Sequence, residues 1–144
     1  MSNAPNTPRI VMDTNVLYAG LRSKNGASFA ILDGIWAGKI GLLLSQTVLT
    51  EYEEILKFYA NALRLTGADI DTILNYLCSV AQHAELNTPW TPNLQDPDDE
   101  AFVKLAVAGR ADFLVTHSMR HFAPATELGI KTLAPSEFLA SIKA

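Results

Sequence analysis

Acidic side chains occur at three separate places in this chain, and the residue types at each suit divalent-metal chemistry. Asp13 directly follows an apolar stretch, Glu51 falls early in an amphipathic stretch, and residues 96–100 contain four carboxylates. Carboxylate oxygens suit Mg²⁺ and Mn²⁺, which assist phosphodiester hydrolysis by polarising the phosphoryl oxygen and activating water. The three places therefore predict a metal-dependent hydrolytic site, provided that the fold gathers them at one edge of a sheet.

Asp13 and Asn15 stand at the carboxyl end of a buried strand that the apolar run over residues 9–12 predicts. Ligand sites of open parallel sheets lie outside this end. The alternative is that Asp13 caps the next helix, near Val16, by accepting from backbone N–H groups two or three residues on. Convergence of other carboxylates on the same edge would favour the functional interpretation.

Glu51 lies near the amino end of a helix that is predicted from the cap Ser45 through Tyr59, and so near the same edge of the sheet. Glu53 and Glu54 point in other directions from this helix, which makes Glu51 the preferred candidate. A carboxylate at this position would also interact with the positive end of the helix dipole, by a few tenths to about 1 kcal/mol, without any site.

The acidic cluster at residues 96–100 opens a helix that is predicted over residues 98–108. Helix capping and the helix dipole account for two of its four carboxylates. Four such charges close together repel one another, so the cluster indicates a bound cation. The alternative is an acidic loop exposed to solvent. Asp99 or Glu100 is best placed to project from the first turn along the apolar face. Asp96 is placed either to reach the site from the loop or to cap the helix.

The rest of the chain alternates strands with helices, which predicts an α/β fold with a parallel sheet covered on both sides. Further strands are expected at residues 40–44, 84–86, 112–116 and 130–133, and further helices at residues 28–38, 69–81 and 135–142. The helix over residues 69–81 is expected to pair with the one before it as a hairpin that forms a lobe over the site.

Composition favours one globular domain over residues 8–144, because 49% of the 144 residues are hydrophobic and 18% are charged. Residues 1–7 are expected to be a flexible lead-in that resembles an expression remnant. A formal charge of −4 gives no overall positive field for tight, non-specific nucleic-acid binding, although bound metal ions can supply positive charge. The absence of a membrane-span or signal pattern and the single Cys78 predict a cytoplasmic protein with no membrane partner.

In this order and spacing, the motifs resemble the PIN-domain family of metal-dependent ribonucleases, especially the VapC-like toxins of bacterial toxin–antitoxin pairs. The resemblance spans residues 9–139 and is carried by residues 11–15, 51–56, 96–100 and 112–116. It implies a three-layer α/β/α PIN-like fold with a central parallel sheet of four or five strands. It also implies Mg²⁺ or Mn²⁺ as cofactor, RNA as substrate, a homodimer and a cognate antitoxin protein as partner.

The resemblance assigns roles to individual residues of this chain. Asp13, Glu51 and Asp99 would be catalytic carboxylates that bind the metal, and Asp96 would be a further catalytic acid. The site would be shaped by Asn15, Thr116 and Ser118.

One position departs from the pattern of the family. After the predicted strand that ends at Thr116, the family commonly has a glycine and then an acidic residue, whereas this chain has His117 and Ser118. A serine can hydrogen-bond a metal-bound water but adds no charge, so a second ion is expected to bind weakly or not at all. His117 or His121 is a candidate to compensate as ligand or proton carrier, although a histidine in a turn is more often neither.

Two other functions stay open on the sequence. A catalytically weak or silent PIN-like module that binds RNA or a protein would explain the serine at position 118. A phosphatase with Asp13 as nucleophile is the other alternative, but the haloacid-dehalogenase type expects a second Asp where Asn15 stands.

Overall fold

The structure, a computed structural model, describes residues 7–85 and 97–143, and these contain one five-stranded sheet in the order β3-β2-β1-β4-β5. Every pair of neighbouring strands is parallel. The strands are β1 (Arg9–Met12), β2 (Gly41–Leu44), β3 (Gln82–His83), β4 (Phe113–Val115) and β5 (Thr132–Leu133). The predicted α/β fold with a parallel sheet of four or five strands is therefore confirmed.

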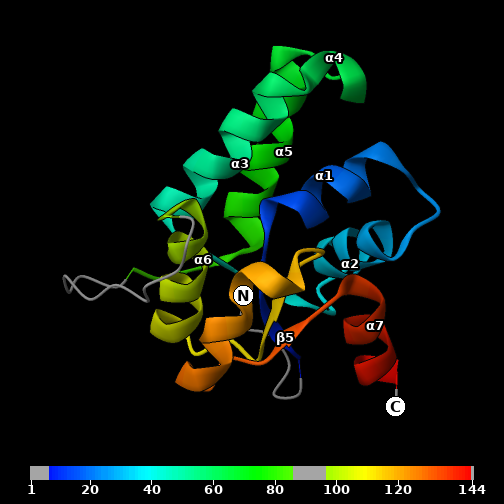
Figure 1. The fold of residues 1–144 in the computed structure, drawn as a ribbon. Helices are drawn as coiled ribbons and strands as arrows, with labels where there is room; N and C mark the ends of the chain where they lie inside the picture. The colour runs from blue at the N-terminus through cyan, green and yellow to red at the C-terminus, as the bar shows by residue number, and fades with distance from the viewer. Residues whose placement is uncertain (1–6, 86–96, 144) are drawn as a thin grey trace.

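Helices cover both faces of this sheet (Figure 1). One group comprises α1 (Thr14–Arg22), α2 (Ala27–Trp36) and α7 (Pro135–Lys143), and the other comprises α3 (Gln46–Phe58), α5 (Gly67–Val80) and α6 (Pro97–Ala108). The helices α3 and α5 run side by side as the predicted hairpin and extend beyond the sheet, with the short α4 (Ala60–Leu63) at their far end. Within the described residues, no helix has the length and apolar character needed to cross a membrane.

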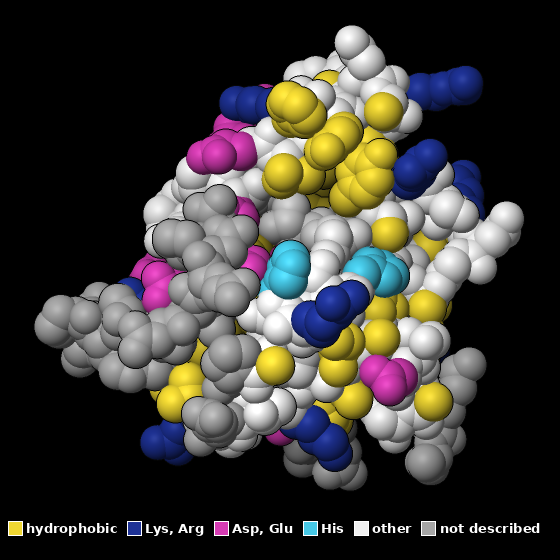
Figure 2. Space-filling view, in the orientation of Figure 1, with side chains coloured by type: hydrophobic (Ala, Val, Ile, Leu, Met, Phe, Trp, Pro, Cys, Tyr) yellow, Lys and Arg dark blue, Asp and Glu magenta, His cyan; other side chains and the backbone are white. Residues whose placement is uncertain are grey.

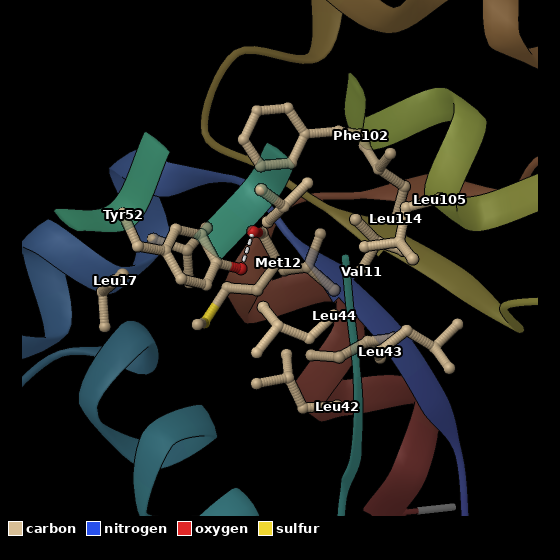
Figure 3. Close-up of a cluster of buried hydrophobic side chains, with 14 of the residues drawn as sticks. Val11, Met12, Leu17, Leu42, Leu43, Leu44, Tyr52, Phe102, Leu105 and Leu114 are labelled. Atoms are coloured by element: carbon tan, nitrogen blue, oxygen red, sulfur yellow. Dashed lines mark hydrogen bonds between the residues drawn. The ribbon is translucent and has the colours of Figure 1, made fainter. Parts of the chain in front are cut away.

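The central strand β1 lies in the hydrophobic core. The side chains of Ile10, Val11 and Met12 have no exposed surface, as expected for a strand that helices cover on both faces. Figure 3 shows Val11 and Met12 among leucines of β2 and the rings of Tyr52 and Phe102. These contacts fix the strand that carries Asp13 at its end.

Several element boundaries differ from the predicted ones. The short strand expected at residues 84–86 was wrong, because β3 is Gln82–His83, although the Ala84 N–H still donates to the Leu44 carbonyl at 2.9 Å. The helix expected at residues 69–81 begins earlier, because Thr66 and Asp69 form a reciprocal capping box. The 3₁₀ segment η1 (Met119–Leu128) and α4 were not predicted at all.

The strand order creates a switch point between β1 and β4. The chain passes from β1 to β2 on one side and reaches β4 on the other, with Met12 in register with Val115. Crevices for ligands form where the connections leave the carboxyl ends of such strands in opposite directions. Asp13 and Thr116 are the first residues beyond these two strands, so both lie at this crevice.

Candidate active site

A cavity of about 380 Å³ opens at the switch point and brings together elements that are far apart in the sequence. Its polar lining includes Asp13 from the end of β1, Glu51 from α3 and Asp99 from α6. The other lining residues are Thr14, Asn15, Tyr18, Ile55, Tyr59, Phe102, Ser118 and His121. The convergence expected from the sequence is thus present in the structure for three carboxylates.

Asp13 caps α1, as one of its two alternatives predicts, and it also lines the cavity, where its functional role stays a prediction. Its Oδ1 accepts from the Thr14 N–H at 2.7 Å, one residue on rather than the two or three expected, and its Oδ2 accepts from the Thr116 hydroxyl at 2.6 Å. The residue is only 7% exposed. Burial raises the pKa of its carboxyl group above 3.8, although both hydrogen bonds act to lower it.

Tyr52 holds the backbone immediately before Asp13. Its fully buried hydroxyl donates to the Met12 carbonyl, a contact that Figure 3 shows. Burial and the nearby charges of Asp13 and Glu51 raise the pKa of the Tyr52 phenol, so it stays a neutral donor. The hydrogen bond therefore ties α3 to the end of β1 without adding charge to the cavity.

Asp99 is the member of the acidic cluster that faces the cavity. Glu100, the alternative, instead lines a second cavity of about 250 Å³ together with Glu85 and Lys104. Residues three or four apart share one face of a helix, and Asp99 accordingly lies in the first cavity with Phe102. Asp96 lies outside the described residues, so its predicted role stays a prediction.

His121 joins the site from η1, whereas sequence analysis named it only as a candidate to compensate for the missing carboxylate. Its Nδ1 lies 3.6 Å from Oδ2 of Asp99. Its pairing with Asp99 was not predictable from the sequence, because it depends on contacts between η1 and α6, which are distant in sequence. His117, by contrast, is absent from the cavity lining, and its Nε2 hydrogen-bonds the Ser28 hydroxyl at 2.9 Å.

Asn15, Ser118 and Thr116 link the ends of β1 and β4. The Asn15 amide donates to the Ser118 hydroxyl at 3.0 Å, and the Ser118 N–H donates to the Thr116 hydroxyl at 2.9 Å. The Thr116 hydroxyl in turn donates to Asp13. This chain of hydrogen bonds keeps the Asp13 carboxylate in one orientation, which agrees with the site-shaping role that the resemblance implied.

The residues of the cavity fit a hydrated divalent ion. No three His, Cys, Asp or Glu side chains in the described part of the chain lie close enough together to enclose an ion by themselves. Mg²⁺, however, is commonly held by one or two carboxylates and several waters, and the cavity has room for waters of roughly 30 Å³ each. A cation would also relieve the cost of charging the buried Asp13 carboxyl group.

Apolar side chains in the cavity are the feature that sequence analysis missed most clearly. Ile55 follows Glu51 at an interval of four on α3, with Tyr59, the C-cap of this helix, four residues further, and Tyr18 follows Thr14 at the same interval on α1. Side chains at this spacing lie on one helix face. Once Glu51 and Thr14 are placed at the site, this four-residue spacing predicts that the apolar residues on the same helix faces also line it.

Comparison with known proteins supplies one family match. A family model described as the PIN domain matches residues 9–120, which include β1 through β4 and every residue of the cavity except His121. No protein of curated function matches the chain significantly.

Proposed function

The chain belongs to the PIN domain family, and on this basis we propose that it is a metal-dependent endoribonuclease. PIN domains are commonly nucleases, so a hydrolase acting on phosphodiester bonds is the starting point. The specific assignment to RNA and to Mg²⁺ or Mn²⁺ is our proposal. It is supported chiefly by the convergence of Asp13, Glu51 and Asp99 on one cavity at the switch point of the sheet.

Asp13, Glu51 and Asp99 would hold the ion, with waters completing its coordination. A bound divalent ion would polarise the phosphoryl oxygen, lower the pKa of a bound water and stabilise the leaving oxygen. Thr116 and Tyr52 keep the Asp13 carboxylate and its backbone in place for this task. Ser118 is placed to hydrogen-bond a water in the cavity, and His121 Nδ1, beside Asp99, is placed to accept or return a proton.

Single-stranded or looped RNA is the proposed substrate, because its exposed backbone can enter an acidic crevice that a double helix cannot. A toxin role, a cognate antitoxin and a homodimer are further parts of this proposal. They are supported only by the resemblance of the sequence motifs to the VapC-like group.

Cleavage of an end-labelled single-stranded RNA in Mg²⁺ or Mn²⁺ tests the proposal. We expect the unsubstituted protein to cleave the RNA in either metal and not in EDTA. The variants Asp13→Asn and Glu51→Gln should not cleave it in either metal. Glu54→Gln is the matched control, because Glu54 is an exposed glutamate of the same helix that does not line the cavity. Loss of cleavage in the control to the same extent, or persistence in EDTA, would contradict the assignment.

A catalytically weak or silent binding module is a second candidate, and Ser118 is the observation that favours it. Its side chain occupies the position where the family commonly has a carboxylate, and here it accepts a hydrogen bond from Asn15. This candidate predicts that RNA binds without being cleaved in either metal. Metal-dependent cleavage that Asp13→Asn abolishes would exclude it.

A further inference from the structure

The cavity continues outward from its carboxylates into a group of aromatic side chains, which we call the aromatic wall: Tyr18, Tyr59 and Phe58. Tyr18 and Tyr59 line the cavity itself, and Phe58 contacts the ring of Tyr59. Figure 2 shows hydrophobic side chains gathered on this face, over the region between α1 and the junction of α3 with α4. The aromatic wall is therefore continuous with the proposed site.

Helix geometry explains this continuity. Glu51 and Ile55 lie four residues apart on α3 and Tyr59, four residues further, is its C-cap, so a carboxylate and an aromatic ring stand at the two ends of this face. Eight residues of α-helix span ~12 Å. A ligand that binds the carboxylates with one group therefore needs another group ~12 Å away to contact the aromatic rings.

The exposed ring surface of the aromatic wall belongs to Phe58 and Tyr59, because Tyr59 and the Arg22 guanidinium lie against the ring of Tyr18. The centroids of Tyr18 and Tyr59 are 4.8 Å apart with the planes tilted by 56°, and those of Phe58 and Tyr59 are 4.8 Å apart at 84°. A parallel stack would cover both faces that meet, whereas tilted and edge-on pairs do not. Phe58 is 78% exposed and Tyr59 39%, so their ring surfaces are accessible to a ligand.

A positive charge accompanies the aromatic wall. The guanidinium carbon of Arg22 lies 6.0 Å from the centroid of the Tyr18 ring, one helical turn further along α1, and the residue is exposed. Arginine beside an aromatic ring binds phosphate and also stacks against flat ligands. The aromatic wall thus has flat apolar surfaces with a cation beside them, whereas the cavity that it borders carries carboxylates.

We infer that the aromatic wall is a stacking platform for a nucleobase of the RNA strand whose phosphate lies at Asp13, Glu51 and Asp99. This inference rests on the proposed ribonuclease function and extends it, because it assigns a base-binding subsite. Aromatic faces bind any base by stacking, so the platform holds single-stranded RNA without reading one sequence. Arg22 neutralises the phosphate that follows the stacked base.

The chemistry of the wall favours a nucleotide strand over a protein segment. A nucleotide strand joins a phosphate, which the carboxylate end of the cavity would hold through a metal ion, to the flat base of a neighbouring nucleotide, which suits the exposed rings. Arg22 adds the charge complementary to a polyanion. Docking of a protein helix would instead be favoured by a groove of aliphatic side chains, and among the described residues that line the cavity only Ile55 is aliphatic.

The test measures binding of two fluorescent hexamers by anisotropy: hexauridylate and a strand with the same sugar-phosphate backbone but no bases. Ca²⁺ replaces Mg²⁺, and a gel verifies that the strands stay intact. For the full chain we expect tighter binding of hexauridylate than of the base-free strand. Tyr59→Leu and Phe58→Leu should each weaken hexauridylate binding about 5- to 100-fold, the range for losing one stacked base, and leave the base-free strand unchanged.

Two controls separate stacking from folding. Tyr59→Phe keeps the ring and should bind like the natural sequence. Tyr76→Leu removes a tyrosine of similar exposure, 41%, that lies outside the cavity against Trp36, and should also leave binding unchanged. Circular dichroism of every variant shows whether the fold is kept, and the highly exposed Phe58 provides a variant with little folding cost.

The outcomes distinguish failure of the inference from failure of the proposed function. Tight hexauridylate binding that neither leucine variant weakens would overturn the stacking platform and leave the ribonuclease proposal standing. Equal weakening of both strands would also overturn it, because the wall would then not be contacting bases. Absence of any RNA binding or cleavage by the unsubstituted protein would overturn the proposed function, and the platform with it.

Discussion

Thr116 Oγ1 donates a 2.6 Å hydrogen bond to Oδ2 of Asp13, across the switch point between β4 and β1. Both residues are buried, with exposed fractions of 0% and 7%. The register of the two strands, with Met12 beside Val115, brings the following residues together. The position of the central carboxylate is thus a direct consequence of how the sheet is assembled.

Replacing Thr116 by valine should weaken metal binding about 10- to 100-fold, the usual cost of removing a group that orients a metal ligand. It should also lower the free energy of unfolding by about 1–3 kcal/mol at neutral pH, because the buried carboxylate loses a donor. Mn²⁺ titration calorimetry and urea denaturation measure the two effects. Thr116→Ser keeps the hydroxyl and should stay near the natural sequence; equal losses in both variants would contradict this role.

The raised pKa of Asp13 predicts a pH-dependent penalty in the metal-free protein. Below its unfolded pKa of 3.8, the carboxyl group is protonated in both states. As pH rises, the unfolded chain ionises first, so stability falls until the pH exceeds the folded pKa. We therefore compare the free energy of unfolding of the unsubstituted protein with that of Asp13→Asn in EDTA. The first minus the second should decrease as the pH rises above 3.8, and it should level off once the pH exceeds the folded pKa of Asp13.

Denaturant titrations at a series of pH values in EDTA measure this difference. Asp33→Asn is the control, because Asp33 is an exposed aspartate of α2 outside the cavity. A difference between the natural sequence and Asp13→Asn that rises with pH would show that the folded protein favours the charged Asp13 carboxylate instead.

Tyr52→Phe should lower the free energy of unfolding by about 1 kcal/mol, because a fully buried hydrogen bond to the Met12 carbonyl is lost. Tyr76→Phe is a matched control: its hydroxyl also donates to a backbone carbonyl, that of Trp36 at 3.2 Å, but the residue is 41% exposed. Water can replace the lost bond in the control, so urea denaturation should show a smaller loss. Equal losses would mean that burial of the Tyr52 contact adds nothing.

Ser118→Asp should restore the carboxylate that the family commonly has after the fourth-strand segment. The added charge lies in the cavity, within reach of the Asn15 amide. Unit charges about 4 Å apart interact by about 1 kcal/mol even in water, so Mn²⁺ affinity should rise at least about fivefold. Ser118→Asn supplies a similar shape without charge and should not reproduce the gain; if it does, charge is not the limiting property of this position.

Much of the fold was predictable because strong local patterns carried it. The apolar run of β1, the Ser45 cap and the amphipathic faces of α3 and α5 each identify one element, and alternation of strand and helix then predicts a parallel sheet. Other elements were missed or misplaced. The segment η1 has spaced apolar residues that sequence analysis did not assign to an element, and β3 is too short, at two residues, for alternation to fix its position.

The carboxylates of the site were predictable from their place relative to strands and helices, whereas their partners were not. Glu51 follows from helix position and face, and the acidic cluster that contains Asp99 follows from its place at the start of a helix. The pairing of His121 with Asp99 and of Thr116 with Asp13 depends on segments that are distant in sequence and adjacent only in the folded chain. The choice of Asp99 over Glu100 likewise required the structure, which places the two side chains in different cavities.

The most direct measurement of the central claim is a calorimetric titration of Mn²⁺ into the natural sequence, Asp13→Asn and Glu54→Gln. The account predicts saturable binding by the natural sequence and by Glu54→Gln, whose side chain does not line the cavity, and loss of that binding in Asp13→Asn. Equal Mn²⁺ binding by all three proteins, or no binding by the natural sequence, would contradict the proposal that this cavity is a metal site.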